Sequence, residues 1–313
     1  MPMEDIIEPI DKQLLLSELT HERFVRDTNY GGNKIYIVNA HNAPNTMKEI
    51  GRLRELAFRQ AGGGTGKSCD IDECDTREIP YQQLIVWSEE MDEILGGYRF
   101  IDCSLPIYDK DGKPELSTAE IFTFSDTFIN KYLPHTIELG RSFVQPKFQS
   151  RQYFKQAIYA LDNLWDGLGA IYMLNKDHIK YFFGKMTMYT SFNQTARDYL
   201  LSFMKLYFKD PDHLVTPING IVPSLTEQQI AEAFPNKNYK DDFKCLNRLV
   251  RDLGENIPPM FNAYMNLSST MKLFGTAPNP YFGGVEETGI LITVDDVYQD
   301  KKARHIDTFK PKN

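Results

Sequence analysis

Residues 135–155, HTIELGRSFVQPKFQSRQYFK, combine residue types that can do chemistry with a spacing that brings them close together. The first half alternates polar and apolar side chains, which predicts a half-buried strand carrying Glu138. Gly140 interrupts this strand, and a glycine inside a strand often marks a bulge or a ligand close to the backbone. A short loop then leads into a helical pattern whose first turn carries Arg151 and Lys155. The stretch therefore offers a carboxylate base, freed backbone N–H groups and an anion site at a helix N-terminus.

The elements that must position this stretch are short strands mixed with helices. Strands are predicted at 34–39, 83–88, 94–102, 121–124, 181–189 and 289–295, and helices after Asn45, after the central strand, and at 190–209, 226–233, 239–253 and 257–274. This order predicts an α/β (α+β) fold with one mixed sheet and without the regular alternation of a doubly wound fold. We expect a mostly helical N-terminal arm (1–33), a core (34–190) and a helical C-terminal extension (191–313) that returns a late strand to the core.

Composition excludes several classes of protein. The net charge of −8 argues against a nucleic-acid partner, because phosphate binding needs an excess of Lys and Arg. The acidic start lacks the apolar region of a signal peptide, and no apolar run approaches the ~20 residues of a membrane-spanning helix. The four cysteines are few and irregularly spaced, which favours reduced thiols. A cytoplasmic enzyme is the resulting expectation.

One short motif points to a different chemistry. Residues 61–68, AGGGTGKS, fit the P-loop pattern, with Lys67 and Ser68 in the phosphate and magnesium positions. A P-loop follows a buried strand and opens a helix, whereas here a charged helix precedes the motif and an acidic segment follows it. Nucleotide hydrolysis is therefore the less favoured alternative.

The acidic segment 69–75, CDIDECD, invites a metal site. Its spacing is not that of a calcium loop, and its two cysteines lack the second pair or the histidines that zinc requires. Pairing of these carboxylates with arginines is the favoured role, and we expect no metal.

Several motifs together resemble a known family. They are the helix with Arg52 and Arg54, Asp72-x-x-Asp75, Gly96-Gly97-Tyr98-Arg99 and Glu138-x-x-Arg141. In this order they resemble the acyl-carrier-protein-dependent N-acyltransferases of the GNAT superfamily, and above all the ornithine-lipid and N-acyl-amino-acid synthases. Some of these carry a misleading haemolysin label, and the acyl-homoserine-lactone synthases are more distant relatives.

The resemblance extends late into the chain and covers roughly residues 34 to 295. It includes Ile257-Pro258-Pro259-Met260 with Tyr264, Phe274-Gly275 and Tyr281-Phe282-Gly283. It implies a GNAT-like mixed central sheet flanked by helices. The loop from Gln145 to Ser150 has no glycine, unlike the Q/R-x-x-G-x-G/A loop of acetyl-CoA binders. This departure favours acyl carrier protein over CoA as the donor.

The resemblance also implies roles for residues around the central strand. In such a reaction an amine loses a proton and attacks a thioester carbonyl, whose oxyanion needs stabilisation. The implied catalytic residues are Glu138 as general base, Gly140 and Arg141, and the implied acceptor-binding residues are Arg54, Asp72, Asp75, Arg99 and Ser142. Two structural alternatives stay open: Glu138 pairs with Arg141 or Arg99 inside the sheet, and the arginines hold Asp72 and Asp75.

The donor side is expected where the strand passes into the next helix. The residues expected at the phosphopantetheine are Val144, Lys147, Ser150, Arg151 and Lys155. Their basic side chains suit an acidic carrier protein, and an ordinary solvated face is the alternative. The implied reaction moves a long-chain 3-hydroxy acyl group to an amino acid such as glycine or ornithine, with no permanently bound cofactor. A peripheral membrane contact and a non-enzymatic, lipid-binding or haemolysin-like protein are the remaining alternatives.

Overall fold

The structure, a computed structural model, describes residues 3–149 and 153–310, and within them not the side chains of residues 149 and 154–158. The chain forms two units. The first comprises Met1–Ser117, Pro134–Lys180 and Gln299–Asn313, and the second comprises Thr118–Leu133 and Tyr181–Tyr298. The three-part division expected from the sequence stays a prediction.

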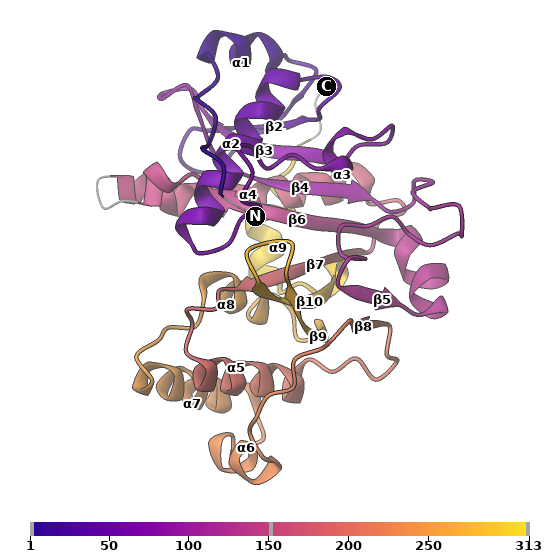
Figure 1. Ribbon diagram of the computed structural model, residues 1–313, viewed down its shortest axis with the longest axis vertical. Helices are drawn as coiled ribbons and strands as arrows, with labels where there is room; N and C mark the ends of the chain where they lie inside the picture. The colour runs from indigo at the N-terminus through magenta and orange to yellow at the C-terminus, as the bar shows by residue number, and fades with distance from the viewer. Residues whose placement is uncertain (1–2, 150–152, 311–313) are drawn as a thin grey trace. The chain divides into compact units, whose positions relative to one another are not determined.

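An antiparallel sheet forms the centre of the first unit (Figure 1). Its strands, in spatial order, are β1 (Phe24–Asp27), β2 (Lys34–Val38), β3 (Gln82–Ser88), β4 (Glu93–Asp102) and β6 (Thr136–Val144). The strands predicted at 83–88 and 94–102 are present as β3 and β4, which form an antiparallel hairpin with Ile85 opposite Gly97. Strand β6 lies beside β4 along most of its length, so Glu138 occupies a strand with a paired neighbour.

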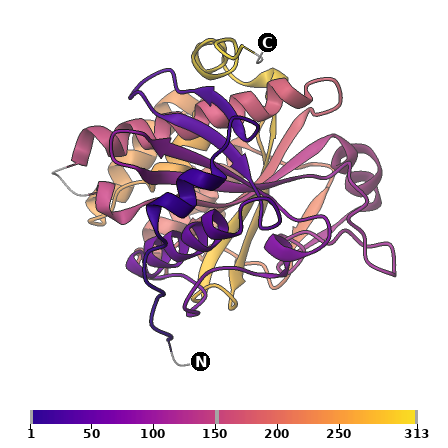
Figure 2. The same cartoon turned by 90° about the horizontal axis from the view of Figure 1, so that it is seen from above.

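Helices cover both faces of this sheet (Figure 2). They are α1 (Lys12–Glu18), α2 (Pro44–Gln60), α3 (Glu73–Thr76), the short 3-10 turn η3 (Pro146–Gln149), α4 (Phe154–Asn175) and α9 (Gln299–His305). Gln83 of β3 bonds Arg54 of α2, whereas the next residue, Leu84, lies where a Cβ on Gly167 of α4 would stand. Since successive strand residues point to opposite faces, α2 and α4 lie on opposite faces of the sheet.

Helix α2 includes Asn45, although the sequence predicted a helix that starts after this residue and could be capped by it. Pro44 is its first residue, a position where the missing proline N–H costs nothing. The carboxylate of Glu18 instead accepts the backbone N–H groups of Asn45 and Thr46, at 3.0 and 2.7 Å. The cap comes from a residue 27 positions earlier, so local sequence carried no sign of it.

The second unit combines strands with helices. Its strands are β5 (Phe122–Phe124), β7 (Tyr181–Met188), β8 (Val215–Pro217), β9 (Lys272–Asn279) and β10 (Val285–Thr293). Its helices are the π-helix η1 (Phe128–Tyr132), α5 (Gln194–Tyr207), α6 (Glu227–Ala233), α7 (Tyr239–Asp252), α8 (Pro259–Met265) and the 3-10 turn η5 (Val294–Asp296). A second 3-10 turn, η2 (Leu133–His135), lies at the boundary of the units. Strand β10 pairs with β7 and β9 in antiparallel fashion, and β5 pairs with β8.

The predicted fold class, α/β (α+β) with a central sheet flanked by helices, is confirmed, and the strand pairing is mostly antiparallel. Two segments differ from the expectation. The helix predicted over 257–274 ends at Met265, and 272–279 is strand β9, whose Phe274 ring packs on Phe128 and Phe183. The N-terminal arm carries strand β1 as well as a helix. Within the described ranges, every helix is too short or too polar to cross a membrane.

Candidate active site

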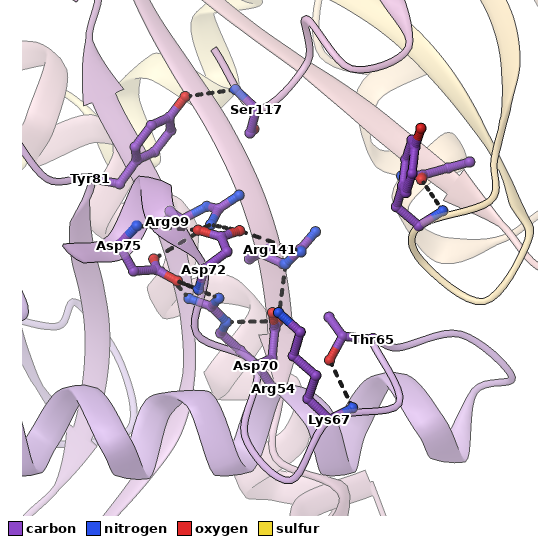
Figure 3. Close-up of polar contacts among 12 residues, drawn as sticks. Arg54, Thr65, Lys67, Asp70, Asp72, Asp75, Tyr81, Arg99, Ser117 and Arg141 are labelled. Atoms are coloured by element: carbon purple, nitrogen blue, oxygen red, sulfur yellow. Dashed lines mark hydrogen bonds and ion pairs between the residues drawn. The ribbon is translucent and has the colours of Figure 1, made fainter. Parts of the chain in front are cut away.

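Three arginines and three aspartates form a closed set of ion pairs in the first unit (Figure 3). Arg54 comes from α2, Arg99 from β4 and Arg141 from β6, whereas the aspartates lie in and around the turn that opens α3. The nitrogen–oxygen distances around the set are Arg54–Asp70 3.0 Å, Asp70–Arg141 3.0 Å, Arg141–Asp72 3.7 Å, Asp72–Arg99 2.6 Å, Arg99–Asp75 3.4 Å and Asp75–Arg54 3.0 Å. We call this set the aspartate–arginine ring.

Most of this ring is buried. The side chains of Arg54, Asp70 and Asp75 are at most 1% exposed, so each charge needs its partners. Burial alone would raise the pKa of Asp70 and of Asp75. The charges of neighbouring arginines outweigh that effect and hold both pKa values below 3.8. The ring carries three positive and three negative charges and is neutral as a whole.

The lowered pKa values predict how stability depends on pH. A carboxyl whose folded pKa is depressed contributes stability above its unfolded pKa, and this contribution is lost as the pH falls. The free energy of unfolding is therefore expected to fall as the pH drops through and below 3.8, with Asp70 and Asp75 each adding at most about 1.4 kcal/mol per pH unit to the slope. Urea unfolding between pH 5 and pH 3 measures this. The Asp75→Asn variant should show the shallower slope, and equal slopes in the two proteins would contradict the assignment.

The side chain of Glu138, the proposed base, is fully buried. The Tyr81 hydroxyl donates a hydrogen bond to Oε2, and the Ser117 hydroxyl lies 3.3 Å from Oε1. Neither residue was predicted as part of the site. The arginine partners considered from sequence, Arg99 and Arg141, lie in the aspartate–arginine ring, and Arg99 also stacks its guanidinium 4.9 Å from the centre of the Tyr81 ring.

The break predicted at Gly140 is a β-bulge. Gly97 faces Phe143 and Arg99 faces Gly140, so β6 holds one residue more than β4 between these two pairs. Arg141, in that interval, has a φ of 47°, which is uncommon for a residue with a side chain. The prediction of a bulge is confirmed, and the strained residue is the arginine that follows the glycine. This conformation turns the Arg141 side chain towards Asp70 (Figure 3).

The structure describes only part of the expected donor side. Val144 ends β6 opposite Gly96, and Lys147 in η3 pairs with Glu93 at 2.6 Å. The Lys147 ammonium also lies 5.5 Å from the centre of the Phe148 ring. Ser150 and Arg151 lie outside the described residues, as does the side chain of Lys155.

In the P-loop-like segment, residues 61–68, a side chain of the protein itself binds the backbone N–H groups of the loop. The fully buried carboxylate of Glu55 accepts hydrogen bonds from the backbone of Thr65 and Gly66, at 3.0 and 2.8 Å, and from the Thr65 hydroxyl at 2.7 Å. Arg59 donates to the same carboxylate at 2.7 Å. Glu55 thus occupies the loop amides that a phosphate would need, which agrees with the sequence context.

Because the loop amides are bonded to Glu55, we predict that the chain does not bind ATP through Lys67. ATP titration by calorimetry should give no saturable signal with the native chain. The Lys67→Ala variant should be as stable as the native chain, because the Glu55 contacts remain. Saturable binding that disappears in Lys67→Ala would restore the nucleotide hypothesis.

Known proteins resemble the whole chain. Residues 53–158 match the family described as Acetyltransferase (GNAT) domain. The chain is 54% identical over 307 residues to a protein of Bacteroides thetaiotaomicron named Glycine N(alpha)-acyltransferase, covering 98% of this chain and 91% of that protein. A protein of Phocaeicola vulgatus with the same name is 52% identical over 307 residues, with 98% and 94% covered. The crystal structure of the AHL synthase LasI aligns with 90% of this chain and 98% of that chain, at a TM-score of 0.44 and 12% identity. The strand with the bulge and the whole aspartate–arginine ring thus lie in the matched segment, and the chain belongs to the GNAT family of N-acyltransferases that includes these glycine N(alpha)-acyltransferases.

Proposed function

We propose that this N-acyltransferase moves a long-chain, 3-hydroxy acyl group from acyl carrier protein to the amine of glycine, giving an N-acyl amino acid. The choice of glycine as the acceptor rests on the sequence identity of 54% and 52%, over nearly the whole chain, with two proteins named Glycine N(alpha)-acyltransferase. The donor and the acyl group follow from the resemblance to acyl-carrier-protein-dependent synthases and from the glycine-free loop after β6.

The outer edge of the aspartate–arginine ring supports an amino acid as acceptor. Asp72 and Arg141 have side chains that are 30% and 13% exposed, and their 3.7 Å contact is the longest in the ring. Glycine carries an ammonium and a carboxylate on one carbon. The ammonium binds Asp72 and the carboxylate binds Arg141, whose guanidinium geometry suits a carboxylate. Arg99 and Asp75 hold Asp72, and Asp70 holds Arg141. Arg54 pairs with both Asp70 and Asp75, and Ser142 is the remaining residue proposed on the acceptor side.

The reaction needs few groups. Glu138 receives a proton from the acceptor ammonium, and the amine then attacks the thioester carbonyl carbon. Backbone N–H groups at the bulge around Gly140 and Ser142 stabilise the developing oxyanion. The C–S bond breaks, and the carrier's thiol leaves as the amide forms. The bulge supports this role because it takes the backbone of β6 out of regular pairing with β4.

Donor and acceptor can be tested together with purified protein. The same 3-hydroxyacyl group is offered on acyl carrier protein, on CoA and on a short pantetheine thioester, each with glycine or ornithine, and products are identified by mass spectrometry. N-acylglycine formed with the highest kcat/KM from the carrier protein is the expected result. A higher kcat/KM with CoA would reject the proposed donor, and N-acylornithine as main product would reject the proposed acceptor.

A further inference from the structure

Three buried residues close a circuit of hydrogen bonds. Tyr81 donates through its hydroxyl to one oxygen of Glu138, and the Ser117 hydroxyl lies 3.3 Å from the other. The backbone N–H of Ser117 donates to the Tyr81 hydroxyl oxygen at 3.0 Å. Tyr81 and Glu138 are fully buried, and Ser117 is 7% exposed. Both oxygens of the base are thus occupied by hydroxyl groups.

Ser117 connects this circuit to the bulge. A Cβ placed on Gly140 would have the Ser117 hydroxyl oxygen at 3.8 Å, and no other described residue beyond its chain neighbours has an atom within 4 Å. Space next to the bulge is therefore open and bordered by this hydroxyl. Since the Glu138 side chain is fully buried, a proton from an acceptor bound there must cross an intervening group.

Tyr81 is held from two sides. The guanidinium carbons of Arg77 and Arg99 lie 5.2 and 4.9 Å from the centre of its ring, within cation–π range. Burial, followed by the charge of Glu138, raises the pKa of Tyr81 well above its usual value. The phenol therefore stays protonated at neutral pH and serves as a fixed donor to the carboxylate. Arg99 also links Tyr81 to the aspartate–arginine ring.

We propose that Ser117 relays the acceptor's proton to Glu138, and that Tyr81 is a positioning residue that fixes the carboxylate for this transfer. The inference rests on the proposed role of Glu138. The acceptor ammonium gives one proton to the Ser117 hydroxyl oxygen while the serine's own proton passes to Oε1 of Glu138. Serine ends unchanged, Glu138 is protonated and the amine has a free lone pair. After attack and C–S cleavage, the amide nitrogen's excess proton neutralises the thiolate, and Glu138 releases its proton to solvent.

A double-mutant cycle tests the relay, because groups that act through one base lose their effect when that base is removed. Ser117→Ala and Tyr81→Phe should each lower kcat about tenfold or more, with KM for donor and acceptor changed less than about twofold. Ser117→Thr, which keeps the hydroxyl, should recover most of the rate. Combined with Glu138→Gln, Ser117→Ala and Tyr81→Phe should each lower the residual kcat less than about twofold further.

The controls separate this inference from the proposed function. Tyr36→Phe, which removes the hydroxyl of another buried tyrosine of the first unit, should keep full kcat. If Glu138→Gln keeps full activity, both the base and the relay are wrong. If Glu138→Gln is inactive but Ser117→Ala and Tyr81→Phe keep full kcat, only the relay is wrong. If the loss of kcat in Ser117→Ala or Tyr81→Phe multiplies in full with the loss in Glu138→Gln, the relay is also wrong.

Discussion

Replacing Glu138 by glutamine is expected to lower kcat about 10²- to 10⁴-fold, the range typical of a lost general base. The protein should stay folded, because the amide oxygen still accepts from Tyr81 and the Ser117 hydroxyl can rotate to accept from the amide. Steady-state kinetics with acyl carrier protein and glycine, together with a thermal unfolding curve, measure both effects.

Two further variants sharpen this test. Glu138→Asp keeps the charge but withdraws the carboxylate from Tyr81 and Ser117, so its kcat should lie between those of the native chain and Glu138→Gln. Glu120→Gln removes an exposed carboxylate three positions after Ser117 and should keep full activity. A kcat for Glu138→Gln within threefold of the native value would remove Glu138 from its role.

Replacing Asp75 by alanine is expected to cause the largest loss of stability among these variants. Its carboxylate is fully buried and contacts Arg54 at 3.0 Å, Arg99 at 3.4 Å and the side-chain amide of Gln83 at 2.9 Å. Removing one partner from a buried ion pair leaves an uncompensated charge, which costs about 3–5 kcal/mol. The free energy of unfolding of the first unit, from urea titration at pH 7, measures this.

An exposed ion pair provides the matched control for Asp75. Asp241 and Lys244 lie 2.8 Å apart on α7, with side chains that are 49% and 68% exposed. Exposed pairs of this kind contribute little, so Asp241→Asn should unfold at the same urea concentration as the native chain. An Asp75→Ala variant as stable as this control would show that the aspartate–arginine ring does not hold the first unit together.

The Glu138 and Asp75 variants act on the same series of contacts. Asp75 and Asp72 fix Arg99, Arg99 stacks on Tyr81, and Tyr81 donates to Glu138. A variant that disrupts the aspartate–arginine ring should therefore shift the Glu138 carboxylate through Tyr81 and lower kcat, even where the protein stays folded. The conservative variant Asp75→Asn is the suitable one for measuring this effect on kcat.

Patterns local in the sequence predicted much of this protein. Strand-forming runs located β3 and β4, alternation of side chains located β6, and Gly140 located the bulge to within one residue. The order of the short motifs indicated the family. These features depend on neighbouring residues, since strand periodicity and a glycine break are properties of a few consecutive positions.

Only the tertiary structure decided which groups surround the base. Tyr81 and Ser117 lie 57 and 21 positions from Glu138, so their contacts depend on strand register and on loops that no local pattern encodes. The same holds for Glu55, which fills the P-loop-like segment ten positions later, and for Glu18, which caps α2. A buried carboxylate must find hydrogen-bond donors wherever the fold brings them, and its sequence neighbours do not reveal them.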